Sequence, residues 1–153
     1  MSSTPSLKTF LKEKKERDEE SGRLADKAEK IELRRSAMAK LFDDIEAWLK
    51  PSIDEGIVLL ERSMYVHSDQ QLGTLSEESM NLVVGASEVF FAPRISSIAG
   101  ASVRVDMTRN DRTLPIVWLP DRGWHFLLRG SVTRTEPVSE ESFEAALREL
   151  LEG

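Results

Sequence analysis

A single uninterrupted stretch at the amino terminus, residues 4–50, can form one long helix, and it constrains the fold more than any other feature. Pro5 suits the first helical turn, and Pro51 is expected to end the helix after Lys50. Such a helix would be about 70 Å long, far longer than a small domain needs. Gly22 is the weak point, and a bend or a break is expected there.

This helix is expected to have parts that differ in side-chain chemistry. Residues 12–23, KEKKERDEESGR, contain no apolar side chain, which is typical of a helix surrounded by solvent. Residues 38–49 show instead the broad apolar face of a helix that lies on a core. Between them runs a thin seam with seven-residue spacing. The seam and its flanking positions are Leu24, Ala28, Ile31, Arg34 and Arg35.

We therefore divide the chain into a charged helical arm, residues 1–36, and a single globular domain, residues 37–153. A core helix with a solvated extension explains the seam without a partner. A second helix, from another copy or from a different protein, would instead bury it. Sustained coiled coils need about three to four heptads and the seam has about two. Exposed apolar positions on a long arm still favour some partner.

The rest of the chain predicts an antiparallel sheet. Short turns at 109–111 and 120–123 join the later strands into a meander. Residues 69–78 are expected to be a polar connection, although 76–84 could open a short helix. Pro115 predicts that its strand lies at an edge or carries a bulge. The expected strands are 57–67, 80–84, 88–95, 103–107, 112–119 and 124–129.

A final helix follows, with Ser139 as its cap and Glu140 and Glu141 beside its positive amino terminus. Its apolar face, like that of residues 38–49, is expected to pack on the sheet. The predicted fold class is α+β: a long N-terminal helix, a five- to six-stranded mostly antiparallel sheet and a C-terminal helix.

The composition narrows the functional classes. The net charge of −6 divides into +1 for residues 1–50 and −7 for residues 51–153, an acidic balance that does not favour nucleic acid as a partner. The absence of cysteine excludes disulfides and thiolate zinc sites and fits a reducing cytosol. The first residues lack the apolar core of a signal peptide, and the sequence has no run of about 18 apolar residues. We expect a cytoplasmic protein that does not contact membranes.

The chain contains no glycine-rich phosphate loop and no cluster of metal ligands, and its histidines are His67 and His125. His67 shares a strand face with Tyr65, but a solvated sheet face explains this spacing as well as acid–base chemistry does. Paired strands could bring a possible ligand or anion face together, with planar donors for a carboxylate or phosphate. A ladder of Arg–Asp pairs, or contact with the Glu-rich last helix, explains the same residues. The residues of this face are Arg104, Asp106, His125 and Arg129.

These features favour binding over catalysis, although they do not exclude an enzyme. We expect a non-catalytic interaction module, such as a subunit, adaptor or chaperone-like protein. Its arm would bind another protein or a second copy of the chain. The alternative is an α+β domain, or an enzyme, that binds a small molecule in a pocket between sheet and helix. No cofactor or metal is expected.

Overall fold

The computed structural model describes residues 4–96, 103–128, 132 and 134–152. The chain divides into two compact units, Met1–Leu33 and Arg34–Gly153. The elements in the described residues are α1 (Thr4–Asp54), β1 (Val58–Asp69), β2 (Gly73–Val84), β3 (Ser87–Arg94), β4 (Val103–Arg109), β5 (Arg112–Leu119), β6 (Gly123–Leu128), β7 (Arg134–Pro137) and α2 (Glu140–Glu152).

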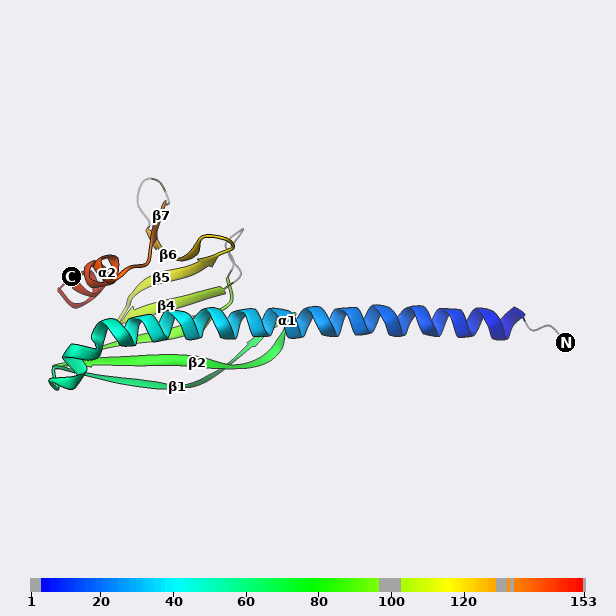
Figure 1. Ribbon diagram of the computed structural model, residues 1–153, viewed down its shortest axis with the longest axis horizontal. Helices are drawn as coiled ribbons and strands as arrows, with labels where there is room; N and C mark the ends of the chain where they lie inside the picture. Colours follow the sequence, from blue (N-terminus) through cyan, green and yellow to red (C-terminus); the bar gives the residue numbers. More distant parts are fainter. Residues whose placement is uncertain (1–3, 97–102, 129–131, 133, 153) are drawn as a thin grey trace. The chain divides into compact units, whose positions relative to one another are not determined.

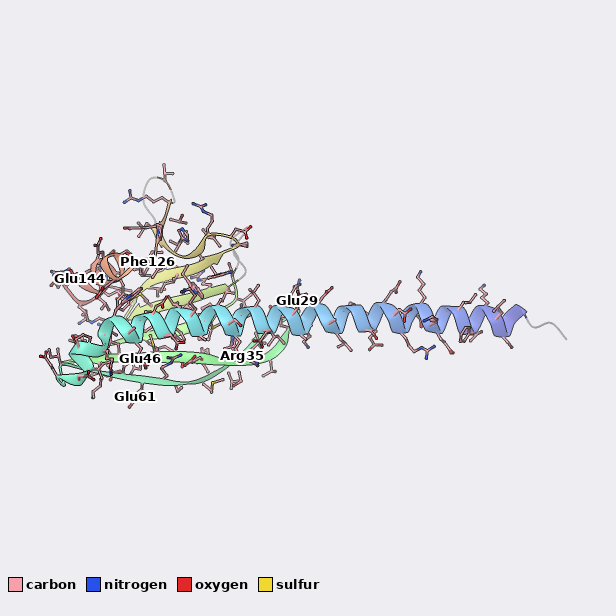
Figure 2. All side chains as sticks on the ribbon, viewed as in Figure 1. Glu29, Arg35, Glu46, Glu61, Phe126 and Glu144 are labelled. Atoms are coloured by element: carbon pink, nitrogen blue, oxygen red, sulfur yellow. The ribbon has the colours of Figure 1, made fainter. Side chains whose placement is uncertain are left out.

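The first unit holds the amino-terminal part of α1, up to Leu33. Every side chain from residue 6 to residue 30 is exposed, and the side chains project on all sides of the helix (Figure 2). Ion pairs one turn apart, Lys14–Asp18 at 3.4 Å and Lys15–Glu19 at 3.9 Å, support this solvated helix. The helix passes through Gly22 without interruption, so the expected break is absent.

The carboxyl end of α1 lies beyond the proline that was expected to end it. Pro51 is inside the helix, which continues to Asp54 because Ile53 packs against the core. Gly56, at φ +74°, ends it: the Gly56 N–H donates to Ile53 O at 3.0 Å and the Ile57 N–H to Ser52 O at 2.9 Å. These two bonds form a Schellman motif, in which glycine adopts the left-handed conformation most easily.

The strands of the second unit form one antiparallel sheet in the order β1-β2-β3-β4-β5-β6-β7 (Figure 1). The predicted α+β class and the meander are confirmed, but the sheet has seven strands where five or six were expected. The additional strand is β7, a four-residue edge strand that pairs with β6 through Phe126↔Glu136 and Leu127↔Thr135. All four of its side chains are exposed, so it has no alternation of polar and apolar residues.

The expected polar connection over 69–78 is wrong for most of its length, and no helix forms at 76–84. β2 begins at Gly73 and pairs with β1 over its whole length, from Val58↔Val84 to Asp69↔Gly73. A three-residue turn joins the strands, and the Asp69 carboxylate accepts hydrogen bonds from the backbone of Gln71 and Leu72. The polar residues of β2 are in a strand because a long partner strand lies beside them.

Pro115 lies in a central strand, so the expectation of an edge strand is wrong. The β4–β5 register runs unbroken through Asp106↔Pro115. β6 pairs with β5 only from Ile116↔Phe126 to Leu119↔Gly123, so Pro115 lies beyond the paired stretch on that side. The missing proline N–H therefore breaks no hydrogen bond of the β5–β6 ladder.

The core of the second unit lies between the sheet and the two helices. From α1 it receives Ala37, Met38, Leu41, Phe42 and Ile45, and from α2 it receives Phe143, Ala146 and Leu150. The Phe91 ring contacts both helices, with centroids 6.5 Å from Phe42 and 6.3 Å from Phe143. Trp124 adds a hydrogen bond of 2.8 Å from its indole N–H to Ala37 O. Both helical faces predicted from the sequence therefore pack on the sheet.

The cap of α2 also agrees with the sequence. The Ser139 hydroxyl accepts a hydrogen bond from the Ser142 backbone N–H at 3.2 Å, and the Ser142 hydroxyl accepts one from the Ser139 N–H at 2.8 Å. This reciprocal arrangement is a capping box, with serine at the position where Glu or Gln is common.

Candidate functional site

The seam residues fall in both units. Leu24 and Ala28 are exposed on the arm, and Ile31 is half-buried. Arg34 belongs to the second unit, where it is buried and paired, while the neighbouring Arg35 is exposed. The exposed apolar part of the seam is therefore confined to the arm.

The arm carries a second apolar group that the sequence prediction missed. Leu7, Phe10 and Leu11 lie within one helical turn of one another, and together with Leu24 they are 53–60 % exposed. The signal was present in the sequence as three apolar residues at spacings of three and four, next to a run of lysines. Large apolar side chains so exposed on a charged helix make this part of the arm a candidate interaction surface.

The structure brings together only part of the predicted ligand face. Arg104 donates from Nε to Asp106 Oδ1 at 2.7 Å and from Nη2 to Oδ2 at 3.2 Å. His125 lies in the same row across the sheet, but Val117 stands between it and Arg104. The His125 ring is buried, with Nδ1 3.0 Å from Gly123 O. Arg129 lies outside the described residues.

A polar cluster that the sequence prediction missed joins the buried residues Arg34 and Glu77 with the half-buried His67. Arg34 donates to Glu77 from Nε to Oε2 at 2.8 Å and from Nη2 to Oε1 at 2.7 Å. His67 Nε2 lies 2.6 Å from Glu77 Oε1. No local pattern could reveal this cluster, because Arg34 and Glu77 are 43 residues apart.

Contacts to β3 and β4 extend this cluster toward the predicted ligand face. Arg34 Nη2 donates to Arg94 O at 3.3 Å, and Arg94 Nη1 donates to Tyr65 Oη at 3.2 Å. Arg94 Nε lies 3.8 Å from Asp106 Oδ2, so it links Tyr65 with Asp106. Each carboxylate here contacts a guanidinium, which is the arrangement that a structural ion-pair network requires.

Two groups in the second unit have shifted pKa values. Desolvation alone would raise the pKa of Glu77, but the hydrogen bonds from Arg34 and His67 outweigh it and hold the pKa below its usual 4.5. The pKa of Arg62 is raised, first by its hydrogen bond to Glu78 and then by Asp43. In both cases the partner charges and hydrogen bonds favour the charged form of the group.

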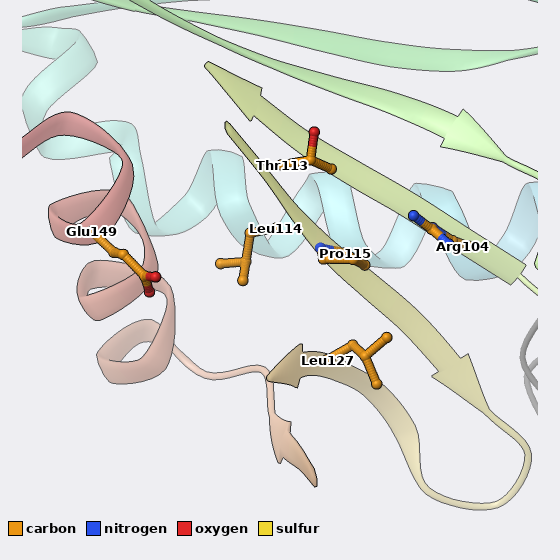
Figure 3. A pocket seen from close by; sticks show the side chains of 6 residues that line it. All are labelled: Arg104, Thr113, Leu114, Pro115, Leu127 and Glu149. Carbon is orange, nitrogen blue, oxygen red and sulfur yellow. The ribbon is translucent and has the colours of Figure 1, made fainter. Parts of the chain in front are cut away.

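A pocket of about 270 Å³ lies between the later strands and α2 (Figure 3). Arg104 of β4 and Glu149 of α2 supply its charged groups. This volume is slightly below the range of about 300–1,000 Å³ that is typical of ligand pockets. The other lining residues are Thr113, Leu114, Pro115 and Leu127.

β1 forms one edge of the sheet, with β2 as its neighbour. Leu59, Met64 and Val66 are 64–66 % exposed, and by strand alternation Leu59 lies on one face while the other two lie on the opposite face. A long edge strand with exposed apolar side chains can pair with another strand. It is therefore a second possible interaction surface.

None of the helices in the described part of the chain has the length and apolar character needed to span a membrane. The described residues also contain no group of three or more His, Cys, Asp or Glu side chains placed to hold a metal ion. Comparison with protein-family models, curated proteins and solved structures finds no match to this chain.

Proposed function

We propose that this protein is a non-catalytic interaction module that uses its helical arm to bind a partner protein or a second copy of itself. The observation that carries the proposal is the exposure of Leu7, Phe10, Leu11 and Leu24 on the arm. Each large apolar side chain gains about 1.5–3 kcal/mol when it is fully buried. An arm with several of these side chains is therefore stabilised by a partner.

The second unit supports this proposal by its filled core. The large side chains Phe42, Phe91 and Phe126 are fully buried, as expected for a scaffold that holds binding surfaces. The apolar edge of β1 adds a surface to which a strand can bind by backbone pairing.

The test replaces the exposed apolar residues of the arm without disturbing the helix. Leu7→Gln, Phe10→Gln and Leu24→Gln are combined in the full chain, since glutamine has good helix propensity. The matched control combines Lys12→Gln, Glu16→Gln and Glu19→Gln, all of which are exposed positions on the same helix.

Quantitative affinity capture with the native chain and both variants is the measurement, with a differently tagged second copy present. The proposal expects at least one protein, or the second copy, to be captured by the native chain and the control and lost with the apolar variant. Identical capture by all three proteins would overturn the proposal.

A second candidate function is binding of a small anionic molecule in the pocket between the sheet and α2. It is favoured by the pocket itself and by Arg104 in its lining, whose guanidinium would bind a carboxylate or phosphate in exchange for, or beside, its bonds to Asp106. The test measures the midpoint temperature of thermal unfolding with and without small dicarboxylates or inorganic phosphate. An increase that Arg104→Ala abolishes and Lys40→Ala retains would support this function, and no increase with either probe would contradict it.

A further inference from the structure

The charges of the arm are separated along its length. Residues 1–15 contain four lysines (Lys8, Lys12, Lys14 and Lys15) and Glu13, which gives a net charge of +3. Residues 16–33 contain four basic and seven acidic residues, which gives −3. Two such arms attract each other when they lie antiparallel, and like charges meet when they lie parallel.

The apolar residues of the arm continue the seven-residue spacing of the seam toward the amino terminus. We call the set that shares this spacing the heptad stripe. Five of its members are apolar, while its middle is polar. The stripe consists of Leu7, Phe10, Lys14, Arg17, Ser21, Leu24, Ala28 and Ile31.

We propose that two copies of the chain associate through their arms as an antiparallel helix pair. This inference rests on the proposed function of the arm and identifies a second copy of the chain as the partner that binds it. In an antiparallel pair each a position packs against a d position of the other helix. One register pairs every member of the heptad stripe: Leu7 faces Ile31, Phe10 faces Ala28, Lys14 faces Leu24 and Arg17 faces Ser21 of the other copy.

This register avoids contact between like charges within the stripe. Lys14 lies against Leu24, where its aliphatic stem can pack while its ammonium reaches solvent. A shift by one heptad in one direction would place Lys14 opposite Arg17, and a shift in the other would leave Leu7 and Phe10 without stripe partners from the arm. The alternative registers are therefore disfavoured.

The positions that flank the stripe add complementary pairs. Glu13 falls beside Lys27 of the other copy, and Leu11 falls beside Ala25. At the centre of the pair, Asp18 lies beside Asp18 of the other copy, and Glu20 lies beside Glu20 of the other copy. Lys14, 3.4 Å from Asp18 in the same helix, reduces the repulsion there. All these flanking side chains are exposed on the arm.

The chain lacks cysteine, so each single-cysteine variant carries one thiol and can report the arrangement. Asp18→Cys places the two thiols side by side in the antiparallel pair, whereas Leu24→Cys does so only in a parallel, in-register pair. Glu29→Cys lies off the stripe and is the control for random collision. Purified full-length variants are oxidised, and covalent dimer is measured on a denaturing gel.

The inference expects Asp18→Cys to form covalent dimer well above the Glu29→Cys control, while Leu24→Cys does not. The solution mass of the native chain should approach twice 17.3 kDa as concentration rises. Glu13→Lys alone and Lys27→Glu alone should each weaken the dimer roughly tenfold. The double variant should restore it.

Cross-linking of Leu24→Cys without Asp18→Cys would overturn the antiparallel arrangement. A monomeric mass at all concentrations, with cross-linking no higher than the control, would overturn self-association itself. That second result leaves the proposed function standing when the capture experiment finds a different partner that depends on the arm. The two failures are therefore distinguishable.

Discussion

Arg34 and Glu77 form a two-point ion pair in which both residues are buried, at 3 % and 8 % exposure. The pair joins the first residue of the second unit to the middle of β2. Arg34 donates to both oxygens of the Glu77 carboxylate, and His67 is a second partner of Oε1. This contact shows why an arginine beside the apolar seam is part of the globular unit.

Removal of one member of this pair should be strongly destabilising. Arg34→Ala leaves the Glu77 carboxylate buried without its guanidinium, and we expect a loss of about 3–5 kcal/mol in the free energy of unfolding. Lys40→Ala breaks an exposed pair with Asp44 on the same helix and should cost less than about 1 kcal/mol. Urea denaturation at neutral pH measures both. Equal losses in the two variants would show that the buried pair adds nothing.

The stability contributed by Glu77 should depend on pH with a defined sign. Its pKa is lower in the folded chain than the usual 4.5, so its stabilisation is fully present above that value and is lost as the pH falls through the folded pKa. The difference in unfolding free energy between the native chain and Glu77→Gln should therefore shrink below about pH 4.5. Urea denaturation from pH 7 to pH 3 tests this, and a constant difference would contradict it.

Substitution of two glycines in and after α1 should act in opposite directions. Gly56 has φ +74°, so Gly56→Ala should destabilise the second unit by about 1–2 kcal/mol. Gly22 lies within the helix with no atom within 4 Å of an added Cβ, so Gly22→Ala should stabilise the arm helix by about 0.5–1 kcal/mol. Urea denaturation measures the first and helical circular dichroism the second. Increased stability of Gly56→Ala would contradict the Schellman ending.

A charge at an exposed position of the β1 edge should reduce aggregation without changing stability. Val66 is exposed, so Val66→Lys should alter the unfolding free energy by less than about 0.5 kcal/mol. It should also slow aggregation, because an edge lysine opposes pairing with another strand. Thr74→Lys adds the same charge at an exposed position on β2 and is the matched control. Equal aggregation rates for the two variants would show that aggregation does not proceed through the β1 edge.

The local sequence was sufficient to predict most helices and strands, but it could not predict β7 or the end of α1. The α2 cap was predictable because Ser139 bonds to residues only three positions away. β7 was not, because its four exposed residues become a strand through pairing with β6. α1 ends later than Pro51 predicts, because the positive φ of Gly56 and its Schellman bonds, and not the proline, end the helix.

The candidate sites also divide into features that local sequence predicts and features that depend on the tertiary structure. Exposed apolar residues on the arm could be found by their helical spacing, as Leu24 was and Leu7 was not. The ligand face was predicted from strand alternation, which placed Arg104 beside Asp106 correctly. It could not show that Val117 separates Arg104 from His125, because cross-strand rows depend on which strands are neighbours.

By itself, the sequence determined the long charged helix, the hairpin turns and the two helical faces that pack on the sheet. These features depend on periodicity and on contacts between residues a few positions apart. Only the tertiary structure decided that Glu77 belongs to a strand and that Arg34 is its partner. Burial of those two charges is tolerated only when each has the other within hydrogen-bond distance, and a pairing across 43 residues has no local signature.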